Sequence, residues 1–163
     1  MRLPSLRLTF LIIFLGCCGL MGVGFYFQYV EELYPCNLCL TQRLFIVLVG
    51  ITGLLAFIFN ANRAGRIVAA VFGGIFAVIG GAVSSRQIWL QSLPEDQVPA
   101  CGPDFAYLFE SFPFMDAVSV MFRGDGNCAE VVWTFLGISI PGWTLVAFIG
   151  LLLINVWQGF RRP

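Results

Sequence analysis

The sequence contains no histidine and few charged side chains. Charged residues make up 11% of its 163 residues, nine of them basic and nine acidic, so the net charge is zero. Hydrophobic residues make up 59%. A soluble domain of this length needs more charge to cover its surface, and the composition therefore predicts an integral membrane protein. Because the chain also lacks a basic tract, we expect no nucleic-acid partner.

The absence of histidine limits the metal sites that the cysteines could form. Four thiolates can hold structural zinc, and Cys-x-x-Cys is a common half of such a site. Cys36 and Cys39 have this spacing, whereas Cys101 and Cys128 do not, and no histidine is present to complete a mixed site. We therefore expect no bound metal.

Four apolar runs are long enough to cross a membrane as helices, since a span needs ~20 mainly apolar residues. The runs lack the alternation of barrel strands, and only helices or closed barrels satisfy the backbone in lipid. The sequence therefore predicts an all-α membrane protein with a single domain of four transmembrane helices and a long loop between helices 3 and 4. The spans are expected at about residues 9–28, 41–60, 67–90 and 143–160, with outer loops at about 29–40 and 91–142.

Basic and acidic residues are segregated along the chain. The two chain ends and the connection between the second and third spans carry arginine and no acidic residue, whereas all nine acidic residues fall in the two outer loops. The arginines of these inner segments are Arg2, Arg7, Arg63, Arg66, Arg161 and Arg162. The positive-inside rule places both termini in the cytoplasm. Cys36, Cys39, Cys101 and Cys128 then face the other, oxidising side, where disulfides form and persist.

The first apolar run also has features of a secretory signal, with Arg2 and Arg7 before it and Gly16-Cys17 as a lipoprotein-like cleavage site. The apolar core of a signal stops after about 7–15 residues. Here the apolar run continues well past Cys17, which predicts an uncleaved span. Cys17 and Cys18 lie inside it, and we expect them to behave as small apolar residues.

A Cys36-Asn37-Leu38-Cys39 motif stands at the mouth of the second span. Its two sulfurs come within disulfide reach when the motif opens a helix, and Pro35 favours such a start. The partial positive charge near a helix N-terminus stabilises the reactive thiolate. Arg43 follows one turn later, about 6 Å along the helix, where its guanidinium can hold a thiolate or an anionic ligand. An arginine this close to lipid indicates function; the structural alternative is a snorkelling side chain beside a static disulfide.

Cys101 and Cys128 lie in the long acidic loop, among glycines, prolines and asparagine. Such surroundings allow movement and access, as a disulfide attacked by another protein requires. A loop of this kind is also stapled simply for order, and the local residues leave both interpretations open.

Two further patterns predict structure. Apolar residues recur at helical spacing within Phe114–Phe122, which is typical of a short amphipathic helix lying on a membrane surface. In the third span a small residue occurs at every fourth position, which predicts a helix face that neighbouring helices approach closely. These small residues are Gly65, Ala69, Gly73, Ala77, Gly81 and Ser85.

With these residues in place, the chain resembles the bacterial disulfide bond formation protein B (DsbB) family over nearly its whole length. The resemblance rests on Tyr34–Cys39, Gln42-Arg43, Ile88–Gln91, Cys101, Gly126–Glu130 and Trp133–Trp143. It implies a multi-pass enzyme of the cell inner membrane, with its redox cysteines in the periplasm. Such an enzyme reoxidises a periplasmic thioredoxin-like dithiol oxidase of the DsbA type and passes the electrons to ubiquinone, or alternatively to menaquinone, drawn from the lipid pool.

The resemblance also implies roles for single residues. The reduced partner attacks the loop disulfide at Cys101, Cys128 and the Cys36–Cys39 disulfide take part in the exchange, and electrons reach the quinone from Cys39. Arg43 supports the charge of quinone and thiolate.

Two positions depart from the pattern of some relatives. Gln42 stands where they carry an acid, and Arg86-Gln87 where they carry a histidine. Gln87 can still donate a hydrogen bond to a quinone carbonyl, so Arg43 and Gln87 are the expected quinone-binding residues.

Two other functions compete with this one. A vitamin K epoxide reductase-like protein also joins thiol pairs to a quinone in a helical bundle, but with a different topology and cysteine placement. A non-catalytic membrane scaffold would use the same two cysteine pairs only as staples.

Overall fold

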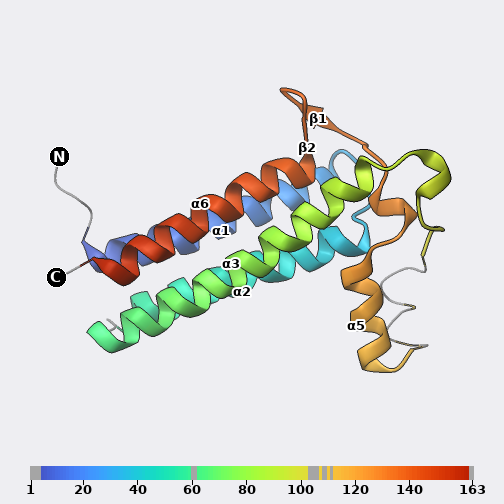
Figure 1. Cartoon of the computed structure of the whole chain (residues 1–163). Helices are drawn as coiled ribbons and strands as arrows, with labels where there is room; N and C mark the ends of the chain where they lie inside the picture. The colour runs from blue at the N-terminus through green and yellow to red at the C-terminus, as the bar shows by residue number, and fades with distance from the viewer. Residues whose placement is uncertain (1–4, 60–61, 103–106, 108–109, 111, 162–163) are drawn as a thin grey trace.

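Four long apolar helices account for most of the chain. The computed structural model describes residues 5–59, 62–102, 107, 110 and 112–161. The four helices are α1 (Leu6–Tyr29), α2 (Asn37–Ile58), α3 (Arg63–Gln91) and α6 (Ile140–Phe160). Each is long and apolar enough to cross a membrane, and together they form an elongated bundle (Figure 1). The predicted four-helix membrane fold is confirmed. Arg2, Asp104, Arg162 and the expected end of the second span at residue 60 lie outside the described residues.

The helix starts follow from local capping chemistry. The Ser5 hydroxyl accepts a hydrogen bond from the backbone N–H of Leu8 at the start of α1, and the Asn62 side chain accepts one from Gly65 at the start of α3. Pro141 lies in the first turn of α6, where its missing N–H costs nothing. These caps satisfy backbone groups that water alone would otherwise have to satisfy at the helix ends.

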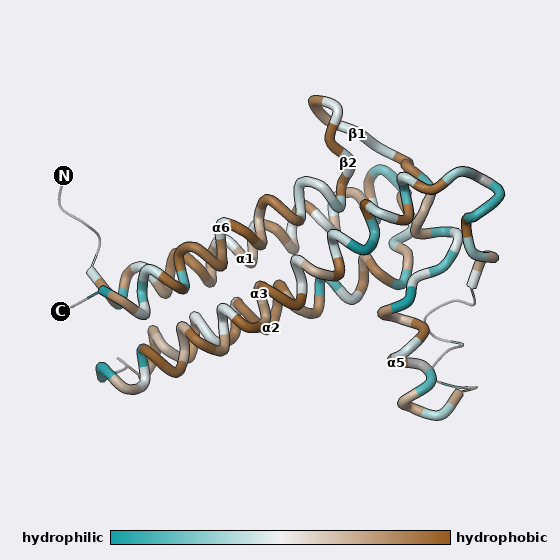
Figure 2. Tube along the Cα trace, in the orientation of Figure 1, coloured by the Kyte–Doolittle hydropathy of each residue, from teal (hydrophilic) through white to brown (hydrophobic). Residues whose placement is uncertain are grey.

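The helices pack mainly in the order α1–α2–α3–α6, and α1 touches α6 at only a few points. Figure 2 shows hydrophobic residues along the helices and hydrophilic ones mostly towards their ends and in the loops. Large apolar side chains such as Leu15, Leu55 and Leu153 are exposed on the outside of the bundle. This distribution suits a bundle whose outer surface faces lipid.

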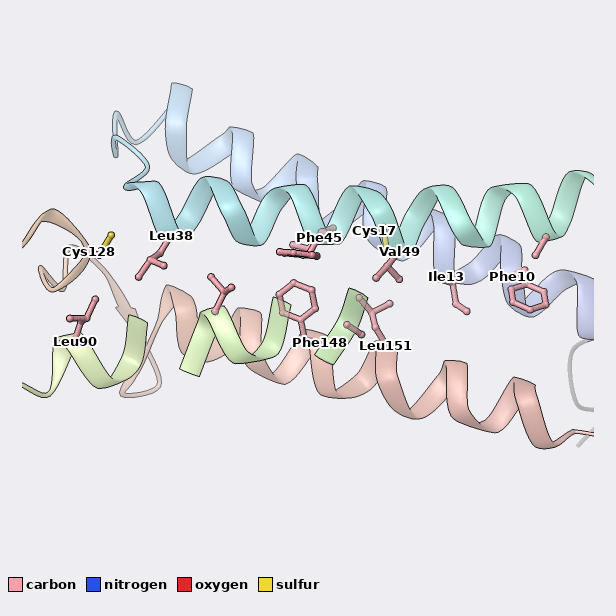
Figure 3. Close-up of a cluster of buried hydrophobic side chains, with 14 residues drawn as sticks. Phe10, Ile13, Cys17, Leu38, Phe45, Val49, Leu90, Cys128, Phe148 and Leu151 are labelled. Atoms are coloured by element: carbon pink, nitrogen blue, oxygen red, sulfur yellow. The ribbon is translucent and has the colours of Figure 1, made fainter. Parts of the chain in front are cut away.

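Glycines allow α3 and α6 to approach closely. A Cβ atom on Gly80 would overlap the ring of Phe148, and one on Gly73 would lie 2.5 Å from Oδ1 of Asn155. Figure 3 shows Phe148 and Leu151 of α6 lying in the core near Phe45 and Val49 of α2. Gly73 belongs to the predicted row of small residues, whereas Gly80 does not and Ser85 of the row is exposed. The close packing of α3 on α6 therefore follows the predicted row only in part.

The chain between α3 and α6 covers one end of the bundle. It contains two short 3₁₀ turns, η1 (Glu95–Gln97) and η2 (Gly126–Cys128), and the helix α5 (Phe114–Arg123). α5 runs across the bundle axis (Figure 1). A helix was predicted at this place from apolar periodicity and is confirmed, whereas its position on a membrane surface stays a prediction.

A small β-hairpin precedes α6, and the sequence analysis did not predict it. Strands β1 (Thr134–Phe135) and β2 (Ile138–Ser139) pair antiparallel, with Phe135 opposite Ile138. Leu136 and Gly137, between the strands, both have positive φ, 53° and 78°, as a tight hairpin turn of the primed type requires. The indole Nε1 of Trp143 donates a hydrogen bond to the carbonyl oxygen of Phe135 over 3.1 Å and ties the hairpin to α6.

Candidate functional site

The Cys-x-x-Cys motif forms the start of α2. Cys36 is the N-cap of the helix and Cys39 lies in its first turn, so their sulfurs come within 3.2 Å of each other. The helix begins at Asn37, earlier than the expected span start at residue 41. All six cysteines are free thiols in this structure. The predicted proximity of the two motif sulfurs at a helix start is therefore observed.

Gln87 of α3 holds both motif sulfurs from one side. Its Nε2 lies 3.4 Å from the sulfur of Cys36 and 3.3 Å from that of Cys39, in hydrogen-bonding geometry. Its Oε1 accepts a hydrogen bond from Nε2 of Gln42 over 2.7 Å. Gln87 and Gln42 are each 3% exposed, so these amide contacts form in a buried environment where water does not compete for them.

Cys128 is fully buried at the end of η2. Its side chain packs in the core cluster with Leu38 of α2 and Leu90 of α3 (Figure 3). The Cys128 thiol also hydrogen-bonds with Cys36, and this contact raises the pKa of the Cys36 thiol, followed by the contact with Cys39 and by burial. The sequence analysis expected a stabilised thiolate within the motif without assigning it to one of the two cysteines; at Cys36 the two thiol neighbours favour the protonated form.

Cys101 is exposed and lies beside the turn that carries Cys128. The backbone N–H of Gly126 donates to the carbonyl oxygen of Ala100 over 3.2 Å. A Cβ atom on Gly126 would lie 2.6 Å from the Pro99 carbonyl oxygen and 3.3 Å from the Cys101 sulfur, so only glycine allows the two segments to touch here. The structure therefore brings all four predicted cysteines to one end of the bundle, with Cys36 in contact with both Cys39 and Cys128 and with Cys101 at the neighbouring surface.

Arg43 is fixed against α1. Its Nη2 donates to the carbonyl oxygen of Gly24 over 2.8 Å, and its Nη1 donates to Oε1 of Gln28. The guanidinium carbon lies 5.7 Å from the centre of the Phe25 ring, within cation–π range. Arg43 therefore stays inside the bundle rim with its charge compensated by backbone, amide and aromatic partners, instead of extending freely to the interface.

A cavity of about 380 Å³ opens beside Arg43 and Cys39. Its walls come from α1, the segment before α2, the hairpin region and the start of α6, and they are mostly apolar. The polar side chains that border it are those of Tyr34, Cys39, Gln42, Arg43 and Thr144, together with the indole groups of Trp133 and Trp143. Ligand pockets of about 300–1,000 Å³ typically combine apolar walls with a few converging polar groups in this way.

The structure separates the two expected quinone-binding residues. Arg43 borders the cavity, whereas Gln87 lies behind the sulfurs and, among the described residues, is not part of the cavity lining. The sequence analysis did not single out the aromatic wall of the cavity, where the rings of Phe27 and Trp133 lie 4.8 Å apart. Trp133 and Trp143 entered the sequence analysis only as the ends of a stretch that carries the family resemblance, and their sequence spacing carries no sign of a shared cavity.

An apolar cavity that touches one of several clustered cysteines, at one end of a four-helix bundle, defines a class: a multi-pass membrane protein arranged for thiol–disulfide chemistry. The chain belongs to the DsbB family, because the family model for "Disulfide bond formation protein DsbB" matches residues 6–158. This match spans the bundle almost from end to end and places the chain in that family rather than with the vitamin K epoxide reductase type.

Curated relatives agree with this assignment. A disulfide bond formation protein B from Saccharophagus degradans is 57% identical over 161 residues, which cover 99% of this chain and 97% of the relative. The protein of the same name from Hahella chejuensis is 50% identical over 96% of this chain and 95% of its own length. Disulfide bond formation protein B 1 from Pseudomonas aeruginosa is 40% identical, with 99% of both chains covered. Family membership supports a disulfide-forming oxidoreductase.

Proposed function

We propose that this protein reoxidises a periplasmic thioredoxin-like dithiol oxidase of the DsbA type and passes the electrons to ubiquinone, in the bacterial inner membrane. One observation carries the proposal. The sulfur of Cys39 lies 3.2 Å from that of Cys36, and Cys39 also lines the apolar cavity beside Arg43. Cys39 is thus in contact with both the cysteine cluster and a place where a lipid-soluble acceptor fits.

Thiol exchange begins at Cys101, which is the exposed member of the Cys101–Cys128 pair. A thiolate of the partner attacks Cys101 in the Cys101–Cys128 disulfide, a mixed disulfide forms, and Cys128 leaves as a thiolate. Cys128 then attacks Cys36 in the Cys36–Cys39 disulfide, and Cys39 leaves as a thiolate beside Arg43. Each step forms one S–S bond and breaks another, so no electrons are lost or gained within the exchange.

The partner is released by its own second thiolate, which attacks the mixed disulfide and frees Cys101. Cys101 then attacks Cys128 in the Cys36–Cys128 disulfide, which restores the loop disulfide and frees Cys36. The chain is left with the Cys36–Cys39 dithiol, which holds the pair of electrons taken from the partner. These electrons leave through Cys39, since this residue lines the cavity.

The residues of the cavity suit a quinone. Its apolar walls match an isoprenoid-substituted ring, and the Arg43 guanidinium and Gln42 amide are hydrogen-bond donors for ring oxygens. A bound quinone supplies a two-electron acceptor of high potential, and this chemistry belongs to the cofactor rather than to the protein. Ubiquinone and menaquinone share these features, so menaquinone is the alternative acceptor. Gln87, expected to bind the quinone itself, acts in this proposal by orienting Gln42 and the sulfurs.

The charge distribution supports the proposed orientation. Arg7, Arg63, Arg66 and Arg161 belong to the helix ends opposite the cysteines. The start of α1 and the end of α6 lie together at that end (Figure 1). By the positive-inside rule this end faces the cytoplasm, and the cysteines face the periplasm, where thiol oxidation is sustained.

The test uses the purified protein in lipid nanodiscs with ubiquinone and a reduced thioredoxin-like dithiol oxidase, and follows the loss of quinone absorbance. We expect catalytic turnover that Cys36→Ser or Cys39→Ser abolishes. Cys18→Ser is the matched control, because Cys18 is exposed on α1 and should leave turnover unchanged. If the wild-type protein does not consume quinone with any such dithiol, the scaffold with two stapling disulfides is the better interpretation.

A further inference from the structure

A buried hydrogen bond joins the start of α2 to the turn that carries Cys128. Nδ2 of Asn37 donates to Oδ2 of Asp125 over 2.9 Å, across 88 residues of sequence. Asn37 is 5% exposed and Asp125 is 4% exposed. Asn37 directly follows Cys36, and Asp125 is the N-cap of the turn that ends at Cys128. The bond therefore connects two points close to two of the cysteines.

Asp125 makes further contacts to the segments that carry the outer cysteines. Its backbone carbonyl oxygen accepts a hydrogen bond from the N–H of Cys128 over 3.0 Å. Gly102, which follows Cys101, packs so closely that a Cβ atom on it would lie 2.6 Å from Oδ2 of Asp125. One aspartate thus touches the head of α2, the Cys101 segment and the Cys128 turn.

The burial of Asp125 costs free energy, which indicates a role beyond stabilising the fold. The other carboxylate oxygen, Oδ1, is buried and has no hydrogen-bond partner among the described residues. A buried carboxylate without full hydrogen bonding costs free energy, and a neutral pair at this place would avoid that cost. Asp125 and Asn37 also border a second cleft, of about 460 Å³, into which Cys36 faces.

We propose that the Asn37–Asp125 pair positions Cys128 against Cys36 for the exchange between the Cys101–Cys128 pair and the Cys36–Cys39 pair. This inference rests on the proposed function. In that exchange the Cys128 thiolate bonds to Cys36 while the Cys36–Cys39 bond breaks and Cys39 leaves as a thiolate, which balances the electrons. Once a partner has opened the Cys101–Cys128 disulfide, the Cys128 turn has lost its covalent link. The Asn37–Asp125 bond then keeps Cys128 beside Cys36. Both residues are positioning residues, since neither takes part in bond exchange.

The test measures how strongly the fold holds the two sulfurs together. In a Cys39→Ser, Cys101→Ser background, the equilibrium of the Cys36–Cys128 disulfide with glutathione gives the effective concentration of the pair. Asn37→Ala or Asp125→Ala should lower it about tenfold, the lower end of what a hydrogen bond to a charged group contributes. The double variant should be no worse than either single one, because the two changes remove the same bond. Asp125→Asn keeps an oxygen acceptor for Asn37 and should retain most of the effective concentration.

The control separates positioning from general damage to the fold. In a Cys101→Ser, Cys128→Ser background, the effective concentration of the Cys36–Cys39 pair should not respond to Asp125→Ala. The proposal is overturned if Asp125→Ala leaves the Cys36–Cys128 value unchanged, or if it lowers both pairs equally. This measurement needs neither quinone nor partner protein, so failure of the proposed function, seen as absent quinone turnover, is distinguishable from failure of the positioning role.

Discussion

Gln42 and Gln87 form a buried pair in which Nε2 of Gln42 donates to Oε1 of Gln87 over 2.7 Å. Because the oxygen of Gln87 is engaged by this bond, its Nε2 is turned towards the sulfurs of the Cys-x-x-Cys motif. Gln42 in turn borders the cavity. The two amides therefore connect the sulfur pair to the cavity wall without an ionisable group.

Gln87→Leu should reduce quinone turnover about tenfold, because it removes the donor to both sulfurs and leaves the buried Nε2 of Gln42 without its acceptor. Gln42→Leu together with Gln87→Leu should cost less than the sum of the two single losses, since both changes remove the same Gln42–Gln87 hydrogen bond. Steady-state quinone reduction by the single and double variants checks this. Fully additive losses would show that the two amides act independently.

Arg43→Ala should raise the apparent KM for ubiquinone about tenfold or more, and should weaken quinone use more than thiol exchange with the partner in the absence of quinone. The reason is that Arg43 borders the cavity, whereas its hydrogen bonds go to Gly24 and Gln28 of α1, away from Cys36 and Cys128. Arg86→Ala is the matched control, because Arg86 lies 4.3 Å over the ring of Trp89, near the end of α3. An unchanged KM in Arg43→Ala would make Arg43 an interfacial anchor only.

The helices could be predicted from the sequence because their signals are local. Apolar runs of the right length and the segregation of arginine from acidic residues depend on neighbours in the chain. The expected span began at residue 41 and so already included the polar residues Thr41 and Gln42, which are 1% and 3% exposed and face the interior of the bundle. The helix α2 itself begins four residues earlier, at Asn37, within the Cys-x-x-Cys motif.

The contacts that shape the site could not be predicted in this way. The Gln42–Gln87 and Asn37–Asp125 hydrogen bonds join residues 45 and 88 positions apart, and neither pair has a spacing that indicates contact. The cysteines were found because a Cys-x-x-Cys motif and its neighbours carry chemistry by residue type alone. That three of them touch while Cys101 stays at the surface depends on the fold of the loop, in particular on Gly126.

Cys128→Ala should trap a covalent complex between Cys101 and the reduced partner. Cys101 is exposed and Cys128 is fully buried, so a partner reaches only Cys101. In the wild-type protein a loop disulfide must first exist between the two, so the variant should be oxidised with a small aromatic disulfide at Cys101 before the partner is added. The partner should carry only its attacking cysteine, because its second thiolate would otherwise release the complex. A non-reducing gel should show the complex, and the additional change Cys101→Ala should remove it. A complex that persists through another cysteine would contradict the proposed order of attack.

Cys36 should resist alkylation in the fully reduced protein. Its pKa is raised, first by the hydrogen bond with Cys128, then by that with Cys39 and by burial. A raised pKa means that Cys36 remains a thiol at pH values where an ordinary cysteine, with a pKa of 9.0, is already ionised, and only the thiolate reacts with iodoacetamide. Mass spectrometry after a timed reaction at pH 8 should therefore find Cys101 modified and Cys36 largely unmodified.

Cys128→Ala should shift this pH dependence downwards, since it removes the first cause of the raised pKa at Cys36. Each unit by which the pKa falls increases the thiolate fraction about tenfold at a pH below it, so alkylation of Cys36 should begin at a lower pH than in the wild-type protein. Cys18→Ser is the control for changed thiol content, because it leaves the contacts of Cys36 intact. If the pH profile of Cys36 is the same with and without Cys128, the two sulfurs do not share a hydrogen bond in the reduced protein, and direct exchange between them loses its structural support.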